Sequence, residues 1–461
     1  MVPKIALRNI LRNRRRSVMT ILAIAVGGVA IVLFGEFVAF IIAGLETNAV
    51  QKVGHLTVFR TGYFDYGSGN PGAFGIDRYR DVIRVIEEDP ELKPKIDVVT
   101  PTISLSGIAG NFDIDASKTF LGTGVEPSAY ERMKRWDEHR VSSRRILPDS
   151  GLADGDETRG IVGVGLARVL GLCGPLKLRD CPPRPATAPA KPSAPAPALV
   201  NLADLEPAAE PRSNSPRLDL LAATAAGAPN VVSLFVSRAE PQAAREFDDN
   251  LVVMNFALAQ KLLYGRGEQK ATGIVVQLHR TEDLPPARAR LSSLFKQHGL
   301  DLEVRDFTER EPFYKQAVGM FTAILLFIAL VMGVIVVFTV VNTMSMTVME
   351  RTSEIGTVRA LGSRRAGVRA LFVIEGAALG IIGATLGILA GQALALLFNH
   401  SGAMWSPPGQ AAPTPLQVMT SDAGKLLFVA WLSLVAIAAL ASLVPANRAA
   451  RLQIVDALRH V

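Results

Sequence analysis

The sequence lacks the motifs of several large enzyme classes. No G-x-x-x-x-G-K-[ST] phosphate-binding loop occurs in its 461 residues, because Gly424 and Lys425 are followed by Leu426. Without that glycine-rich backbone cradle and its hydroxyl, the chain is not expected to hydrolyse ATP. The G-x-S-x-G and H-E-x-x-H motifs are also absent from the sequence. We therefore expect a protein that is not an enzyme and holds no cofactor of its own.

Histidine and aromatic residues are scarce. The chain has six histidines, and no second His, Cys or acid stands at ligand spacing from His55 in the sequence. A structural role for His55 is therefore favoured over a metal site. Aromatic residues make up 6% of the chain and do not alternate with a basic patch. This pattern predicts no nucleic-acid partner.

Long apolar segments are abundant. The chain is 49% hydrophobic and 20% charged, which indicates a mixture of membrane and water-exposed parts. A helix needs about 20 residues to cross the hydrocarbon core of a bilayer. Four windows are long enough, and we expect transmembrane helices at residues 17–45, 318–342, 367–398 and 426–445.

The basic residues predict the orientation of these spans. Residues 1–16, 349–369 and 447–461 together carry 14 basic and three acidic residues, although the whole chain has a net charge of only +7. Basic flanks favour the cytoplasmic side. We therefore expect a cytoplasmic interfacial helix at 1–16, a cytoplasmic tail at 446–461, a large outer domain at 46–317 and a short outer loop at 399–425.

The outer segment has the pattern of a mixed α/β domain. Two α/β halves flank a Pro- and Ala-rich insertion at residues 182–217, which is expected to be extended. A sheet completed by distant segments is predicted. Strands are expected at 53–60, 98–108, 115–122, 272–278 and 302–307, and helices at 78–88, 251–263 and 285–297.

The two cysteines lie in this outer segment. Seven residues separate Cys173 from Cys181. Outside the cytosol such a pair favours a disulfide, which would contribute about 2–3 kcal/mol in the chain-entropy model. Two free thiols or a metal pair are the alternatives, and no companion ligand supports the metal.

The segment at residues 349–365 is charged and amphipathic. Ile355, Val358 and Leu361 recur at helical spacing, which predicts a short helix. The other face carries the charged side chains of Glu350, Arg351, Glu354, Arg359, Arg364 and Arg365.

Two runs in the sequence carry a family resemblance. The first run consists of Glu350, Arg351, Thr352, Glu354, Ile355, Gly356, Arg359, Ala360, Gly362, Glu375 and Gly376. The second run is P-A-x-x-A-A-R at residues 445–451, followed by A-L-R at 457–459. Both runs resemble the FtsX-like permease family, which includes MacB-type exporters and the lipoprotein-releasing permeases of LolC and LolE type.

This resemblance implies a bacterial inner-membrane protein with four transmembrane helices and a MacB-like periplasmic domain. Both termini would be cytoplasmic, and two permeases, identical or different, would join two ATPase subunits that bind ATP and Mg. The 349–365 segment would be the coupling helix, so Glu354→Lys or Arg359→Glu is expected to weaken ATPase binding. The implied docking residues are Glu350, Arg351, Glu354, Ile355, Arg359 and Leu361.

Small and acidic residues stand out within the predicted spans. Glu36 is expected near the outer membrane interface, and Glu375 is expected to pair with Arg369. A small-xxx-small ladder predicts a closely packed helix face, either within the chain or against a second permease. It consists of Gly376, Gly380, Gly383, Gly387 and Gly391.

The cargo is predicted by resemblance only. Sixteen residues precede the first predicted span, which favours a separate ATPase subunit and the transmission of its motion to the outer domain. Release or transport of lipoprotein or envelope lipid is the expected function, with membrane lipid and a periplasmic carrier or adaptor as further partners. A MacB-type drug or peptide exporter, or an FtsX-like regulator of a cell-wall hydrolase, is the alternative.

Overall fold

The computed structural model divides the chain into two compact units. It describes residues 8, 12, 14–67, 69–141, 150–178, 181, 216–242, 245–265, 269–405, 414–420 and 423–453. The first unit comprises Met1–Leu45, Phe313–Trp405 and Pro415–Val461, and the second comprises Glu46–Pro312 and Ser406–Thr414. Most of the Pro- and Ala-rich insertion and most of the segment 1–16 lie outside the described residues.

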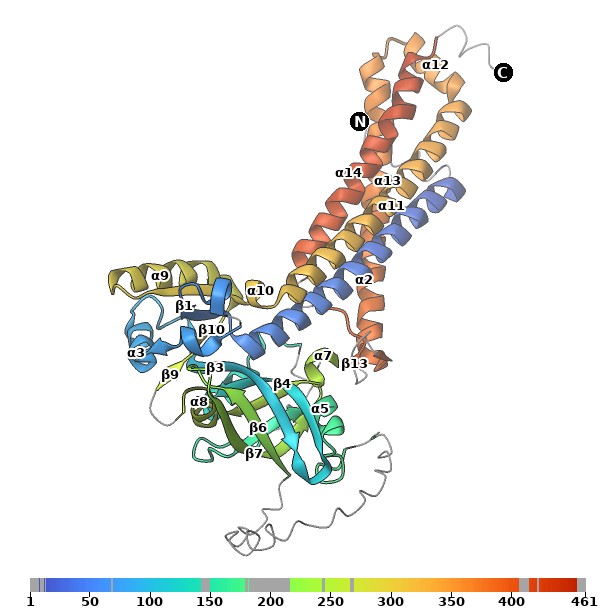
Figure 1. Ribbon diagram of the computed structural model, residues 1–461. Coiled ribbons are helices and arrows are strands. Elements are labelled where there is room, and N and C mark those ends of the chain that lie inside the picture. The colour runs from blue at the N-terminus through green and yellow to red at the C-terminus, as the bar shows by residue number, and fades with distance from the viewer. Residues whose placement is uncertain are drawn as a thin grey trace, which may run out of the picture. The chain divides into compact units, whose positions relative to one another are not determined.

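Four helices of the described chain are long and apolar enough to cross a membrane, as the sequence predicts (Figure 1). Each contains one predicted span but is longer than it. Helix α11 begins with Pro312, whose missing N–H costs nothing in a first turn. Helix α13 ends before Gly402, which has a φ of 64°. The four helices are α2 (Arg14–Val53), α11 (Pro312–Glu350), α13 (Arg365–Ser401) and α14 (Gly424–Arg451).

The first unit is packed mainly through small residues and aliphatic side chains. Leu379 on α13 and Leu434 and Ala438 on α14 are almost completely buried. They belong to one cluster with Ile24 of α2 and Val336 of α11. Helix α12 (Thr352–Ala360) also belongs to this unit and lies between α11 and α13 in the chain.

The second unit is built on a nine-stranded mixed sheet with the order β11-β1-β10-β3-β4-β8-β5-β7-β6. Strand β1 near the start of the unit pairs with β10 and β11 near its end, so distant segments complete the sheet as predicted. The strands are β1 (Leu56–Arg60), β3 (Ile96–Asn111), β4 (Ala116–Val125), β5 (Arg159–Gly163), β6 (Arg217–Ala223), β7 (Pro229–Glu240), β8 (Leu251–Asn255), β10 (Gly273–Leu278) and β11 (Leu302–Asp306).

The long strand β3 joins two parts of this sheet. Its first residues pair with β10, and its later residues pair with both β4 and β6. Because β6 also closes the far end of the order, strands β3, β4, β8, β5, β7 and β6 form a ring. Strand β3 therefore belongs both to the α/β part, where it pairs with β10, and to the ring of strands, where it pairs with β4 and β6.

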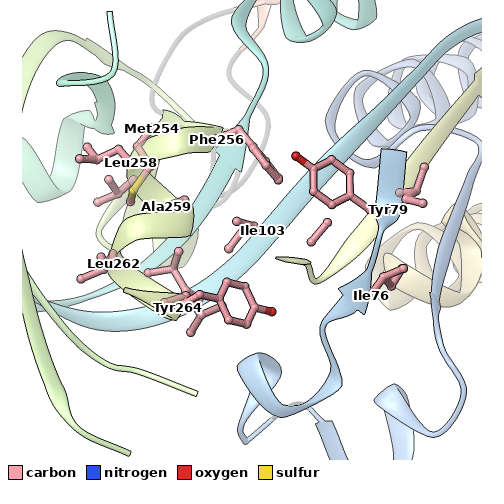
Figure 2. Packing of buried hydrophobic residues seen from close by; sticks show 14 of the residues in the cluster. Ile76, Tyr79, Ile103, Met254, Phe256, Leu258, Ala259, Leu262 and Tyr264 are labelled. Atoms are coloured by element: carbon pink, nitrogen blue, oxygen red, sulfur yellow. The ribbon is translucent and has the colours of Figure 1, made fainter. Parts of the chain in front are cut away.

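Helices α3 (Tyr79–Glu88), α8 (Phe256–Tyr264) and α9 (Leu284–Gln297) supply apolar side chains to the core of the second unit. Figure 2 shows Phe256, Leu258 and Leu262 of α8 near Ile103 of β3, with Tyr79 of α3 on the other side. This apolar core connects both parts of the sheet.

One predicted helix is wrong in its first half. Residues 251–255 form strand β8, which pairs with β4 in parallel and with β5 antiparallel, and only α8 is helical. Val252 and Val253 suit a buried strand. Asn255 then caps α8, because its side-chain oxygen accepts from the backbone N–H of Ala257 at 2.9 Å.

Shorter elements connect these strands and helices. They are the turns of helix η1 (Tyr63–Gly67), η2 (Pro71–Phe74), η3 (Phe112–Ile114) and η4 (Thr281–Asp283), the helices α4 (Pro127–Lys134), α5 (Val164–Val169), α7 (Arg245–Asp248) and α10 (Phe307–Arg310), and the short strands β2 (Ile76–Asp77), β9 (Lys270–Ala271), β12 (Met404–Trp405) and β13 (Thr414–Pro415).

Candidate functional site

The predicted coupling segment folds as a short helix between two long ones. Helix α12 is shorter than the expected 349–365, because α11 continues to Glu350 and α13 begins at Arg365. Gly362 has a φ of 97°, which lets the chain reverse after α12. Ile355 and Gly356 are buried, so one face of α12 packs on the first unit.

The acidic side chains of this segment form ion pairs inside the chain. Glu354 Oε1 and Oε2 lie 2.8 and 3.0 Å from Arg12 Nη2. Glu350 Oε1 lies 2.5 Å from Arg16 Nη1 at the start of α2. The Arg12–Glu354 pair is half exposed on both sides, and pairs of this kind contribute only about 0–1 kcal/mol to stability. Their main effect is to join α12 to the N-terminal segment.

Two of the basic side chains, Arg351 and Arg359, are also engaged inside the first unit. Arg351 and Glu375 are both about 6% exposed, and their charged groups lie 3.7 Å apart. The expected partner of Glu375 was Arg369, but the buried pair is formed with Arg351. The guanidinium of Arg359 donates to the backbone carbonyl of Leu452.

These contacts bring together the two runs that carry the family resemblance. Ile355 of α12 belongs to the same buried cluster as Ala446, Ala449 and Ala450 at the end of α14. The hydrogen bond from Arg359 to Leu452 adds a polar contact to the segment after α14. The remaining residues of the final run, 457–459, lie outside the described residues.

The outer face of this segment is apolar. Leu361 is 83% exposed, and Val358 is 48% exposed. Met349 at the end of α11 is 72% exposed. Of the six predicted docking residues, Leu361 is therefore the apolar one that remains open to a partner. Sequence reasoning placed Val358 on the apolar face but did not choose it as a docking residue.

The glycine ladder of α13 packs within the chain. A Cβ atom on Gly387 would lie 2.6 Å from the carbonyl oxygen of Ala25 on α2, which is closer than real Cβ contacts allow. A Cβ atom on Gly376 would lie 2.5 Å from Ser442 Cβ on α14. The ladder therefore has two faces. Gly383, Gly387 and Gly391 face α2, whereas Gly376 and Gly380 face α14.

Glu36, the acidic residue of the first predicted span, lies inside the first unit. Glu36 is 0% exposed, and its carboxylate accepts a hydrogen bond from the side-chain amide of Gln392 on α13. Its backbone carbonyl accepts from the backbone N–H of Met419 at 3.1 Å. Its side chain is therefore buried among the helices, and its expected depth near the outer membrane interface stays a prediction. Gln392 was missed, although a polar residue directly after Gly391 in an apolar span is a signal that could have found it.

An apolar pocket lies near this pair in the first unit. Its volume is about 290 Å³. It is lined by Ala30, Leu33, Phe34, Phe37, Phe398, Leu416 and Val418. A pocket with this lining suits a hydrocarbon chain or another apolar group.

In the second unit, Cys173 and Cys181 form a disulfide. His55 is fully buried and accepts a hydrogen bond on Nδ1 from the backbone N–H of Leu278 at 3.0 Å. Burial lowers the pKa of His55 to about 4, although the charge of Glu46 acts in the opposite direction. His55 is therefore neutral at physiological pH.

The chain thus has the features of a membrane protein: four candidate spans in its first unit and a large mixed α/β fold in its second. A family model described as "FtsX-like permease C-terminal" matches residues 326–454, which include α12, most of α11 and all of α13 and α14. The match thus covers the first run and residues 445–451 of the second run.

Curated relatives agree with this match. An ABC transporter permease of Methanocaldococcus jannaschii is 25% identical over 33% of this chain and 39% of its own length. The macrolide export ATP-binding/permease protein MacB of Neisseria gonorrhoeae is 30% identical over 42% of this chain and 28% of its own length. The ABC transporter permease YtrF of Bacillus subtilis is 28% identical over 30% of this chain and 32% of its own length.

The chain thus spans well under two thirds of each of these relatives. All three names contain the word permease, and the matched family is a permease family. These similarities support an FtsX-like permease of the ABC transporter type.

Proposed function

We propose that this chain is a permease subunit that receives motion from a separate ATPase subunit and passes it to the unit of residues 46–312. The observation that carries the proposal is α12, a short helix between two membrane-length helices. Its charged side chains are occupied inside the chain, while Leu361 and Val358 present apolar surface outward. A short helix with an exposed apolar tip is suited to insertion into a groove of a partner.

We further propose the topology and the assembly. The N-terminus, α12 and the C-terminal tail would be cytoplasmic in a bacterial inner membrane, because the basic flanks favour that side. The second unit would be periplasmic, which agrees with its disulfide between Cys173 and Cys181. Two copies of an ABC ATPase and two permeases would complete the transporter.

The proposed cargo is a lipoprotein or another envelope lipid. The apolar pocket lined by Phe34, Phe37 and Phe398 supports a cargo with hydrocarbon chains. A periplasmic carrier or adaptor would then receive the released molecule. A second candidate is export of a macrolide-like drug, which is favoured by the similarity to macrolide export proteins of MacB type. The same pocket chemistry would serve an apolar drug.

The test is mass spectrometry of the full chain, purified in mild detergent from cells that express its native neighbours. We expect an ABC ATPase together with acylated lipoprotein or bound lipid. Absence of any ATPase would overturn the central proposal. An ATPase without lipid would point to another cargo, and faster ATP hydrolysis on addition of macrolides would then favour the exporter. Recovery of a cell-wall hydrolase instead would favour an FtsX-like regulator.

A further inference from the structure

Three side chains with metal-binding groups meet in the second unit, although they are far apart in the sequence. Glu46 lies on α2, while Glu138 and His139 lie in the turn that follows α4. One ligand atom from each of the three lies within 4.8 Å of the others. Glu46 Oε1 and His139 Nε2 are 3.3 Å apart. This separation is close to the edge of a tetrahedral zinc site with metal–ligand bonds of about 2.0–2.2 Å.

We propose that Glu46, Glu138 and His139 form a binding site for a divalent transition-metal ion, with Zn²⁺ as the preferred ion. One imidazole nitrogen and two carboxylate oxygens are ligands that Zn²⁺ accepts in proteins. Three protein ligands leave a position for water. The side chains of Glu46, Glu138 and His139 are 12%, 23% and 24% exposed, so the site is sheltered but open to an ion from solvent.

A set of hydrogen bonds already orients both carboxylates. The backbone N–H of Thr281 donates to Glu138 Oε2 at 2.8 Å, and the Thr281 hydroxyl donates to Glu46 Oε1 at 2.6 Å. Metal ligands in proteins are commonly fixed by such outer contacts. Thr281 therefore holds the two acidic ligands in place from one position at the start of η4.

His55 extends this outer set. Because the Leu278 N–H donates to His55 Nδ1, the proton of the neutral ring lies on Nε2. His55 Nε2 is 3.2 Å from the Thr281 hydroxyl oxygen and can donate to it. His55 then donates to the Thr281 hydroxyl, and that hydroxyl donates to the Glu46 carboxylate. His55 thus acts as a positioning residue for the site and is not itself a ligand.

A simpler account of the same contacts is an ion pair between protonated His139 and Glu46. Arg280 Nε lies 3.8 Å from Glu138 Oε1 and offsets part of the negative charge. The metal site and the ion pair predict different numbers of bound metal ions per chain and different effects of added metal on stability. An ion binding here would join α2 to the turn after α4 and raise the melting temperature of the chain, whereas an ion pair gains nothing from added metal.

The test uses the full chain in detergent, purified with a tag that contains no histidine and stripped with a chelator. Zn²⁺ binding is measured by competition with a chromogenic chelator, with Mn²⁺ and Mg²⁺ in parallel. We expect one Zn²⁺ per chain. H139Q and E46Q should each weaken binding by more than about 100-fold, and Thr281→Val by about 10–100-fold as an outer-contact change. His298→Gln, which removes an exposed histidine of the same unit, should have no effect.

Binding of less than one Zn²⁺ per chain, or equal binding by wild type and H139Q, would overturn the proposal and leave the ion pair as the role of these residues. Loss of binding in His298→Gln would also overturn it. If H139Q and E46Q fail to fold, the wild type loaded with Co²⁺ decides the question. X-ray absorption must then show one imidazole nitrogen among oxygen ligands, and its absence refutes the site.

Discussion

Among the residues expected to dock to the ATPase subunit, Leu361 is the apolar one that the structure leaves exposed. The family resemblance implied a mixed docking set that included Glu354, Arg359 and Leu361, but Glu354 and Arg359 both make contacts within the chain. Leu361 has no such role, since its side chain is 83% exposed. An exposed leucine on a short helix is a better candidate for an anchor in a partner's pocket.

We predict that Leu361→Asp strongly reduces recovery of the ATPase subunit without lowering the stability of the permease. A buried apolar anchor typically contributes about 2 kcal/mol or more to binding, which corresponds to about 30-fold in affinity. The measurement is co-purification together with a melting curve of the permease alone. The control is Ser363→Asp, which introduces the same charge in the same exposed turn.

Charge reversal at Glu354 should act differently. Glu354→Lys would separate α12 from Arg12, and the double change with Arg12→Glu should restore the pair. If Leu361→Asp leaves ATPase binding intact while Glu354→Lys abolishes it even with Arg12→Glu, docking depends on the charge and not on the apolar tip.

Asp89 and Arg290 form a second informative pair, in the second unit. Asp89 is 5% exposed, and its carboxylate accepts hydrogen bonds from Arg290 at 2.7 and 3.1 Å. These bonds, together with the backbone N–H groups of Glu91 and Leu92, hold the pKa of Asp89 below its usual value, against the effect of burial. Stabilisation from a lowered pKa is present above the unfolded-state value and is lost as pH falls through the folded-state value.

We therefore predict that Asp89→Asn melts at a lower temperature than wild type at pH 7 and that this difference shrinks steadily below about pH 4, the usual pKa of an aspartate. The measurement is a series of melting curves between pH 7 and pH 3. Glu91→Gln provides the control, since its carboxylate is 65% exposed. A difference that stays constant over the series would show that Asp89 does not contribute through its charge.

At the scale of elements, α13 is the helix around which the first unit is packed. Its glycines let α2 approach on one face and α14 on the other. The close contacts between Gly387 and Ala25 show why a side chain is not tolerated there. Close approach of this kind is how small residues stabilise membrane helix pairs.

We predict that Gly387→Leu destabilises the first unit by about 1–3 kcal/mol, the usual cost of overpacking, or separates α2 from α13. Gly367→Leu is the matched control, because Gly367 lies on the same helix with nothing within 4 Å of an added Cβ atom. Thermal unfolding in detergent and cross-linking between α2 and α13 would measure the effect. Equal stability of both variants would contradict the packing role of Gly387.

At the scale of the whole molecule, the second unit has its own core. Strands β1 and β11 lie near its two chain ends and pair with each other over five residues. The buried cluster that runs through Leu56, Ile103, Phe295 and Val304 contains no residue from the four long helices of the first unit. A part of the chain with a closed sheet and its own core should fold alone.

We predict that residues 46–312, expressed by themselves under oxidising conditions, give a soluble protein that unfolds cooperatively. Circular dichroism and a melting curve provide the measurement. Removing residues 302–312 as well should abolish folding, because β11 would be lost from the sheet edge beside β1. A 46–312 fragment without a cooperative transition would show that the unit depends on the rest of the chain.

The sequence by itself determined the features that rest on local composition. Runs of Leu, Ile, Val and Ala long enough for a bilayer predicted the four long helices, since hydrophobic length is a local property. Short segments with strand character predicted β1, β3, β4, β10 and β11 in the same way. The runs around Glu354 and after Pro445 pointed to the permease family through residue order alone.

Only the tertiary structure decided which distant groups meet. Glu375 pairs with Arg351 and not with Arg369, and the glycines of α13 divide between α2 and α14. His55 has no potential ligand at suitable spacing in the sequence, yet folding brings Thr281 to it and Glu46 to Thr281. Such contacts depend on chain topology and side-chain packing across hundreds of residues, and no local pattern encodes them.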